Sequence, residues 1–72
     1  MPYIKIEVTR EGVTREQKQQ LIKGVTDVIT MVLNKDPHLT HVVIQEIALD
    51  DWGYAGDQVS VLREQGITAD KK

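Results

Sequence analysis

The pattern of apolar and polar residues divides the first half of the chain into a strand and a helix. Between Tyr3 and Val8 the two kinds of side chain alternate, which is typical of a strand with one buried face. Thr14 and Gln17 then have the spacing of a capping box, in which each side chain binds a free backbone N–H at a helix start. Beyond them, apolar residues recur at helical intervals, at Leu21, Val25, Val28, Ile29 and Val32. The pattern therefore predicts a helix from about Arg15 to near Asn34, where Asn-Lys-Asp-Pro ends it.

A second strand is predicted from His41 to Ile47, where β-branched residues dominate and both faces are largely apolar. At its end, one of Gln45 and Glu46 should face solvent or a subunit contact, and we assign neither any chemistry. A strand, a long helix and a second strand form a βαβ unit, in which a right-handed crossover makes the strands parallel and places the helix on one face. The other, apolar face would be bare, although parallel sheets need both faces covered. We therefore expect an α+β fold in which a second copy of the chain covers that face.

Glycine residues punctuate the rest of the chain. The segment Asp50-Asp51-Trp52-Gly53-Tyr54-Ala55-Gly56 predicts an aromatic turn. The following Val59-Ser60-Val61-Leu62 is short enough to be one arm of a hairpin that reaches a neighbouring copy. We expect a single domain over residues 1–65 and a flexible tail over residues 66–72.

Length and composition make association the expected route to stability. The chain has 72 residues and no Cys, so no disulfide supplements the small core that this length allows. We expect no metal, because His38 and His41 are the only imidazoles and no cluster has ligand spacing. A net charge of −2 argues against nucleic-acid or anionic-membrane partners. No apolar run reaches the length of a signal peptide or a membrane span, so we expect a cytoplasmic protein.

Pro2 is the residue with the most distinctive chemistry, because it follows the initiator Met1 and precedes the first strand. Removal of Met1, which a small penultimate side chain permits, would expose a rigid secondary amine. An α-amino group has a pKa of about 7.7–8.0 in water, and a dry pocket lowers that pKa by disfavouring the charged form. A neutral amine at working pH is a general base. The alternative is that Pro2 is only an edge proline, whose missing N–H does no harm there.

The order of these features resembles the 4-oxalocrotonate tautomerase family. The resemblance runs from Pro2 to about Ser60 and rests on the chain length, the penultimate proline and the segments Glu11-Gly12, Thr14 to Lys18, Leu21-Ile22, Leu39-Thr40, Glu46 and Trp52 to Gly56. It implies βαβ subunits with a short C-terminal hairpin, four-stranded sheets formed across each dimer, and homohexamers built as trimers of dimers. It also implies a cofactor-free keto–enol tautomerase for a small enol or 2-keto acid, with Pro2 as general base once Met1 is gone.

The chain departs from the family at the substrate-binding positions. In the best-known members, two arginines from neighbouring subunits hold the substrate carboxylates. The matching positions here are Val13 and His41. Arg10, in what resembles a one-residue insertion, would supply a guanidinium or be a solvated turn residue. His41 would donate a hydrogen bond or simply open the strand. Trp52 matches the aromatic wall of the family's pocket, but a sole Trp suits a core or an interface equally well.

Two other functions stay open at this point. Asp50 and Asp51 are expected to form the turn. A carboxylate that faced the pocket would instead activate water, as in the family's hydratase and dehalogenase branch. The chain could also be a non-catalytic oligomeric module of the same fold, with Pro2 blocked. The preferred interpretation is a tautomerase with Pro2 as the catalytic residue and His41, Arg10 and Trp52 as substrate-binding residues.

Overall fold

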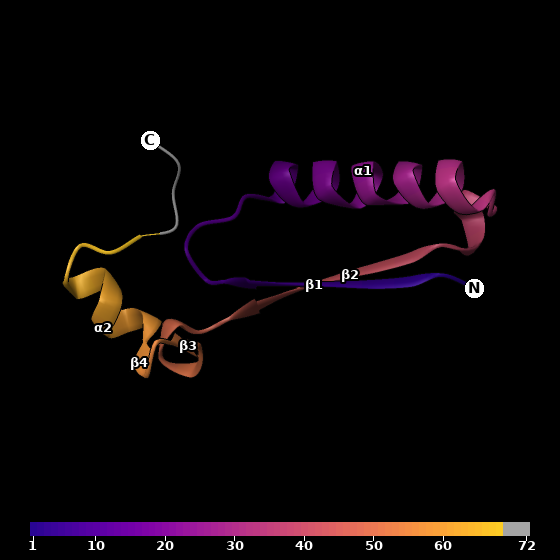
Figure 1. Cartoon of the computed structure of the whole chain (residues 1–72). Helices are drawn as coiled ribbons and strands as arrows, with labels where there is room; N and C mark the ends of the chain where they lie inside the picture. Colours follow the sequence, from indigo (N-terminus) through magenta and orange to yellow (C-terminus); the bar gives the residue numbers. More distant parts are fainter. Residues whose placement is uncertain (69–72) are drawn as a thin grey trace.

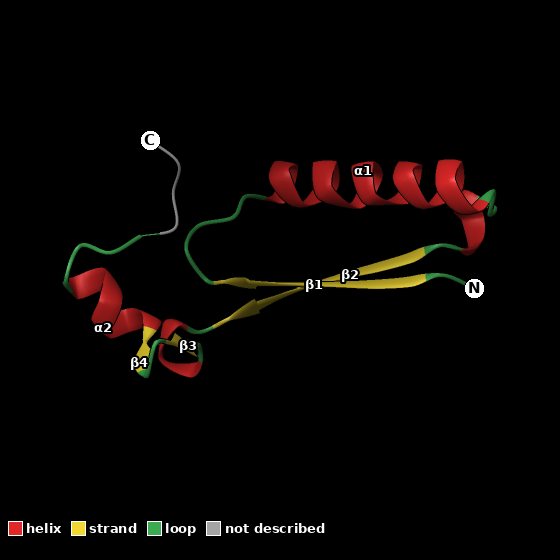
Figure 2. Ribbon diagram, in the orientation of Figure 1, coloured by secondary structure: helices red, strands yellow, loops and turns green. Residues whose placement is uncertain are grey.

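The computed structural model describes residues 1–68, and its main unit is a helix lying along a two-stranded sheet (Figure 1). Strand β1 (Tyr3–Thr9) and strand β2 (His41–Ile47) are parallel, in register from Tyr3 beside His41 to Thr9 beside Ile47. Helix α1 (Arg15–Leu33) connects them through the short 3-10 turn η1 (Pro37–Leu39) and covers one face of the sheet (Figure 2). The predicted βαβ unit with parallel strands is confirmed.

Helix α1 begins and ends where the sequence signals place its ends. The Thr14 side chain accepts a hydrogen bond from the backbone N–H of Gln17 at 3.1 Å, and the Gln17 side chain accepts one from the backbone N–H of Thr14 at 2.9 Å. At the other end, Asn34 has a φ of 53°, in the left-handed region that commonly closes helices. The capping box and the stop are both confirmed.

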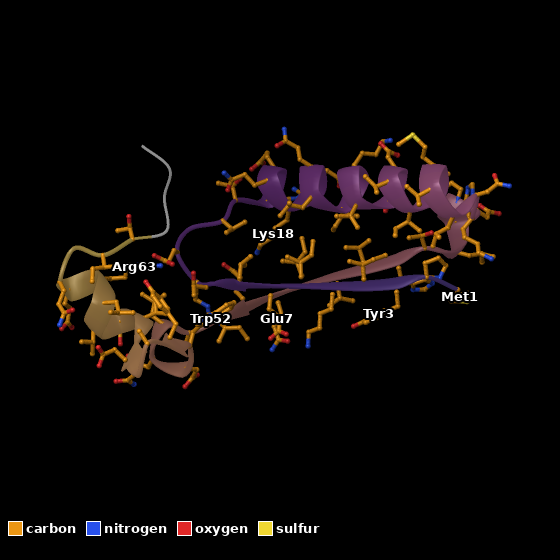
Figure 3. The ribbon with its side chains drawn as sticks, in the orientation of Figure 1. Met1, Tyr3, Glu7, Lys18, Trp52 and Arg63 are labelled. Atoms are coloured by element: carbon orange, nitrogen blue, oxygen red, sulfur yellow. The ribbon has the colours of Figure 1, made fainter. Side chains whose placement is uncertain are left out.

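The uncovered face of the sheet is more polar than expected. Side chains at every second position of β1 and β2 are half-buried toward α1, whereas those between them are exposed. The exposed set consists of Tyr3, Lys5, Glu7, His41, Val43 and Gln45. Figure 3 shows Tyr3 and Glu7 pointing away from the helix. The expectation of a bare apolar face was wrong, because the strand alternation sends most of the apolar side chains to the helix side.

The C-terminal lobe, residues 48–67, lies beyond the end of β2 (Figure 1). It contains the 3-10 turn η2 (Leu49–Asp51), an antiparallel hairpin of β3 (Gly53–Tyr54) and β4 (Asp57–Gln58), and helix α2 (Val59–Glu64). The predicted C-terminal hairpin is confirmed, but the assignment of residues 59–62 to one of its arms was wrong. Val59 and Leu62 are three residues apart, so a helix turns both to one face, whereas a strand would point them to opposite faces. Both are buried in the lobe.

Within the described residues, Val59 and Leu62 are the only buried side chains. The accessible surface is 5680 Å², whereas a compact monomer of this mass exposes about 4,500 Å². Val28, Met31 and Val32 on α1 are 52%, 76% and 70% exposed. A single copy therefore leaves much of its apolar surface uncovered.

The end of the lobe is tied back to α2. The backbone N–H of Ile67 donates to the Leu62 carbonyl at 2.9 Å, and that of Gly66 donates to the Arg63 carbonyl at 3.0 Å. Residues 69–72 of the predicted flexible tail lie outside the described residues. Neither α1 nor α2, the two α-helices in residues 1–68, is both long and apolar enough to cross a membrane.

Candidate functional site

Pro2 and His41 are neighbours at one end of the sheet. The backbone N–H of His41 donates to the Pro2 carbonyl at 3.0 Å, directly before the point where Tyr3 pairs with His41. Pro2 is half-buried and His41 is exposed. Met1 is 83% exposed, so its removal would take away no buried side chain. While Met1 is attached, the Pro2 nitrogen is an amide and has no useful basicity.

Arg10 and Trp52 lie at the opposite end of the same strands. The backbone N–H of Arg10 donates to the Ile47 carbonyl at 2.8 Å, which continues the β1–β2 ladder by one residue. Trp52 directly follows η2 and is half-buried. Figure 3 shows Trp52 and Met1 at opposite ends of the sheet. Seven residues of strand span about 23 Å, so within one copy Arg10 and Trp52 lie far from Pro2 and His41.

Trp52 lines an open hollow of about 390 Å³, together with Glu7, Ile47, Asp51 and Gly53. The carbonyl of Trp52 accepts a hydrogen bond from the backbone N–H of Val59 at 2.7 Å, which joins the hairpin to the start of α2. Asp50 and Asp51 belong to η2, and the Asp50 carbonyl accepts a hydrogen bond from the side-chain amide of Gln58 at 3.0 Å. Trp52 is thus available as one wall of a pocket that Asp51 also lines.

Val13 also lines a hollow, and here the structure supplies a guanidinium that the sequence did not predict. This hollow has a volume of about 410 Å³ and is lined by Val8, Thr9, Glu11, Gly12, Val13, Gln17 and Arg63. Arg63 comes from α2, at the other end of the chain. Val13 therefore shares its surroundings with an arginine from the C-terminal lobe.

Glu11 and Arg63 form a bidentate ion pair. Arg63 donates from Nε to Glu11 Oε2 at 2.7 Å and from Nη2 to Glu11 Oε1 at 3.0 Å. The hydrogen bonds from Arg63, helped by one from the Thr9 hydroxyl, lower the pKa of Glu11 from its ordinary 4.5 to about 2. Glu11 in turn raises the pKa of Arg63, and Tyr54 adds to this shift. No local pattern indicates a pair separated by 52 residues.

A family model described as a tautomerase enzyme matches residues 2–62. The chain belongs to the tautomerase family. This confirms the resemblance stated from the sequence. The match begins at Pro2 and extends into α2, so it includes all four predicted site residues.

Individual tautomerases share both the sequence and the fold. The probable tautomerase K2 of Dickeya dadantii is 46% identical over 65 residues, which cover 90% of this chain and 97% of that protein. The crystal structure of DmpI from Helicobacter pylori has 43% identity and a TM-score of 0.82, over 88% of this chain and 97% of that one. A heterohexameric 4-oxalocrotonate tautomerase from Chloroflexus aurantiacus has 21% identity and a TM-score of 0.80, over 88% of this chain and 100% of that one. At this level of identity the likeness shows the fold alone.

A second unpredicted ion pair lies between helix α1 and the sheet. Lys18 Nζ on α1 donates to Glu46 Oε2 on β2 at 3.0 Å, with side chains 33% and 27% exposed. Figure 3 shows Lys18 reaching from α1 toward the sheet. Lys18 shares its helix face with Leu21 and Val25, and this spacing was the available signal that it points inward. Gln45 is the exposed member of the Gln45-Glu46 couple.

The described residues offer no donor set for a metal ion. Residues 1–68 contain no group of three or more His, Asp or Glu side chains close enough to hold one. His38 instead lies with Nδ1 3.0 Å from the Asp36 carboxylate in the exposed turn η1.

Proposed function

We propose that this tautomerase interconverts the enol and keto forms of a small 2-keto acid, with the Pro2 amine as general base after Met1 is removed. The observation that carries the proposal is the family match beginning at Pro2, a half-buried proline that directly follows the exposed Met1. Neither feature depends on a cofactor, and we propose that the reaction uses none.

The proposed reaction moves one proton and forms no covalent intermediate. In ketonisation, the neutral Pro2 amine accepts the hydroxyl proton of the enol while the carbonyl forms, and the resulting prolyl ammonium returns a proton to the adjacent carbon. His41 is beside Pro2 and would donate a hydrogen bond to the oxygen on which negative charge develops. Trp52 would form the dry wall that keeps the amine neutral, and Arg10 would bind the substrate carboxylate.

The complete site requires more than one copy of the chain, because Pro2 with His41 and Arg10 with Trp52 lie at opposite ends of the strands. We propose a homohexamer, arranged as a trimer of dimers, in which the Arg10 end of one copy meets the Pro2 end of another. The uncovered apolar residues of α1 support association.

The substrate class follows from the residues at the family's arginine positions. Val13 and His41 occupy them, so a dicarboxylate loses two bidentate charge-assisted contacts. We therefore propose a monocarboxylic enol as the preferred substrate.

The experiment compares wild type, Pro2→Ala and the matched control Pro37→Ala, which alters the chain's other proline in η1. Ketonisation of phenylenolpyruvate and of 2-hydroxymuconate is followed by ultraviolet absorbance, after intact mass has established that Met1 is absent. We expect Pro2→Ala to lose about 100-fold or more in kcat/KM, Pro37→Ala to stay near wild type, and phenylenolpyruvate to be the better substrate. Equal rates for wild type and Pro2→Ala would refute the role of Pro2 as general base. A preference for 2-hydroxymuconate would refute the proposal that a monocarboxylic enol is the preferred substrate.

A hydratase or dehalogenase of the same superfamily is the second candidate, and Asp51 is the residue that favours it. Asp51 lines the same hollow as Trp52, where a carboxylate would activate water while a protonated Pro2 polarised the substrate. Asp51→Asn would then abolish water addition to an unsaturated acid and leave ketonisation intact. Retention of Met1 by the protein in its own host would favour the third possibility, a non-catalytic oligomeric module.

A further inference from the structure

The Glu11–Arg63 pair joins the two parts of the chain that carry Arg10 and Trp52. Glu11 directly follows Arg10 in the loop between β1 and α1, and Arg63 projects from α2 in the C-terminal lobe. The side chains of Glu11 and Arg63 are 35% and 17% exposed, so most of the Arg63 side chain is enclosed. Figure 3 shows Arg63 at the top of the lobe, on the side of this loop.

Within residues 1–68, this pair provides the only side-chain hydrogen bonds between the C-terminal lobe and the βαβ unit. The other side-chain hydrogen bonds of the lobe stay within it, from Gln58 to the Asp50 carbonyl and from Arg63 Nη1 to the Ile67 carbonyl at 2.7 Å. Without the pair, the two parts would be joined only by the backbone, where β2 continues into η2, and by apolar contacts.

A continuous set of contacts runs from Arg10 to Trp52 through this pair. Arg63 lies one helical turn after Val59, and the backbone N–H of Val59 donates to the Trp52 carbonyl at 2.7 Å. At the other end, the Arg10 N–H is held by the Ile47 carbonyl. The ion pair bridges these two anchored segments.

We propose that Glu11 and Arg63 are positioning residues that hold Trp52 at a fixed orientation relative to Arg10. The inference rests on the proposed function in one respect, since it takes Arg10 and Trp52 as parts of the substrate pocket. Two parallel hydrogen bonds from a planar guanidinium fix an angle as well as a distance, which the single ammonium of lysine does not do. The pair therefore determines substrate complementarity without touching the substrate.

The test uses Arg63→Met, Arg63→Lys, Glu11→Gln and the Glu11→Gln/Arg63→Met double variant. Trp52 is the only tryptophan, so intrinsic fluorescence and acrylamide quenching report its surroundings without interference. We expect Arg63→Met to shift the emission to the red and to raise the KM for phenylenolpyruvate about tenfold, with a much smaller change in kcat. The double variant should have an emission shift and a KM no larger than those of either single variant, because each single substitution already removes the same interaction. Arg63→Lys should be intermediate.

The matched control is Lys23→Met, which breaks an ion pair of Lys23 with Asp27 on the exposed side of α1, at 2.7 Å. It should leave emission, quenching and KM unchanged. Sedimentation and far-ultraviolet circular dichroism identify any variant that fails to assemble or fold. If Arg63→Met is one of these, Arg63→Lys is compared with wild type in its place. The proposal would be overturned if Arg63→Met had the fluorescence and the KM of wild type. It would also be overturned if the changes in KM of the two single variants added up in the double variant.

Failure of this inference and failure of the proposed function give different results. If Pro2→Ala is inactive while the Arg63 variants match wild type in both readouts, the positioning role alone is wrong. If wild type and Pro2→Ala have equal rates, the proposed function is wrong, and the fluorescence of the Arg63 and Glu11 variants still decides whether the pair holds Trp52.

Discussion

At the scale of single residues, Glu11 shows how far hydrogen bonds from neighbouring side chains can lower the pKa of a surface carboxyl. It accepts hydrogen bonds from the Thr9 hydroxyl and from two nitrogens of Arg63. All of them favour the charged form of the carboxyl, which is why the pKa of Glu11 lies at about 2. The role of Pro2 as general base stays a prediction, made from a proline that directly follows Met1. The sequence did not predict this pair, whose members meet only through folding.

The depressed pKa of Glu11 makes part of the stability pH-dependent. A carboxyl whose pKa is lowered by folding contributes stability above its unfolded pKa, here near 4.5, and that contribution is lost as the pH falls toward about 2. We expect Arg63→Met to return the pKa of Glu11 most of the way to 4.5, as measured by carboxyl-carbon NMR titration. Lys23→Met should leave it unchanged. A Glu11 carboxyl that titrates near 4.5 in wild type would show that the pair does not form in solution.

At the scale of elements, the boundaries of α1 are encoded locally. The capping box of Thr14 and Gln17 and the left-handed Asn34 depend on neighbours within a few residues, so the sequence predicts them well. The misassignment of Val59 to Leu62 has the opposite cause. A four-residue segment with three apolar side chains fits either a strand or a helix turn, and only packing against the rest of the lobe selects the helix.

Removal of the helix cap should cost measurable stability. Thr14→Ala leaves the N–H of Gln17 without its side-chain acceptor, so we expect the free energy of unfolding to fall by about 1 kcal/mol. Urea unfolding at a fixed protein concentration, monitored by circular dichroism, measures the change. Gln19→Ala, at an exposed position of the same helix, should cause no loss. An unchanged midpoint for Thr14→Ala would mean that the first turn of α1 is stabilised by other contacts.

At the scale of the whole molecule, the single copy is too extended to be an independent domain. Its radius of gyration is 15.2 Å, whereas a compact domain of this length has about 11 Å. The sheet has two strands, which rarely suffice for independent stability. The same geometry that separates Pro2 from Trp52 also leaves the flank of α1 bare, so assembly would complete the fold and the site together.

Unfolding should therefore depend on protein concentration. If folding and assembly are coupled, a hundredfold increase in concentration adds about 2.7 kcal/mol of apparent stability, which raises Tm by roughly 5 °C or more. Thermal circular dichroism between micromolar and submillimolar concentrations, together with sedimentation, measures this. A folded monomer with a constant Tm would contradict both the assembly and the shared site.

The sequence by itself determined what neighbouring residues encode: the strand from Tyr3, the helix between Thr14 and Asn34, the second strand at His41–Ile47, and the proline on which the proposed chemistry rests. These features follow from periodicity and capping, which act over a few residues. The tertiary structure decided that Pro2 lies beside His41, that Arg10 and Trp52 lie at the far end, and that Arg63 binds Glu11. Such pairings depend on strand register and on how the lobe docks, and these are set by the packing of the entire chain.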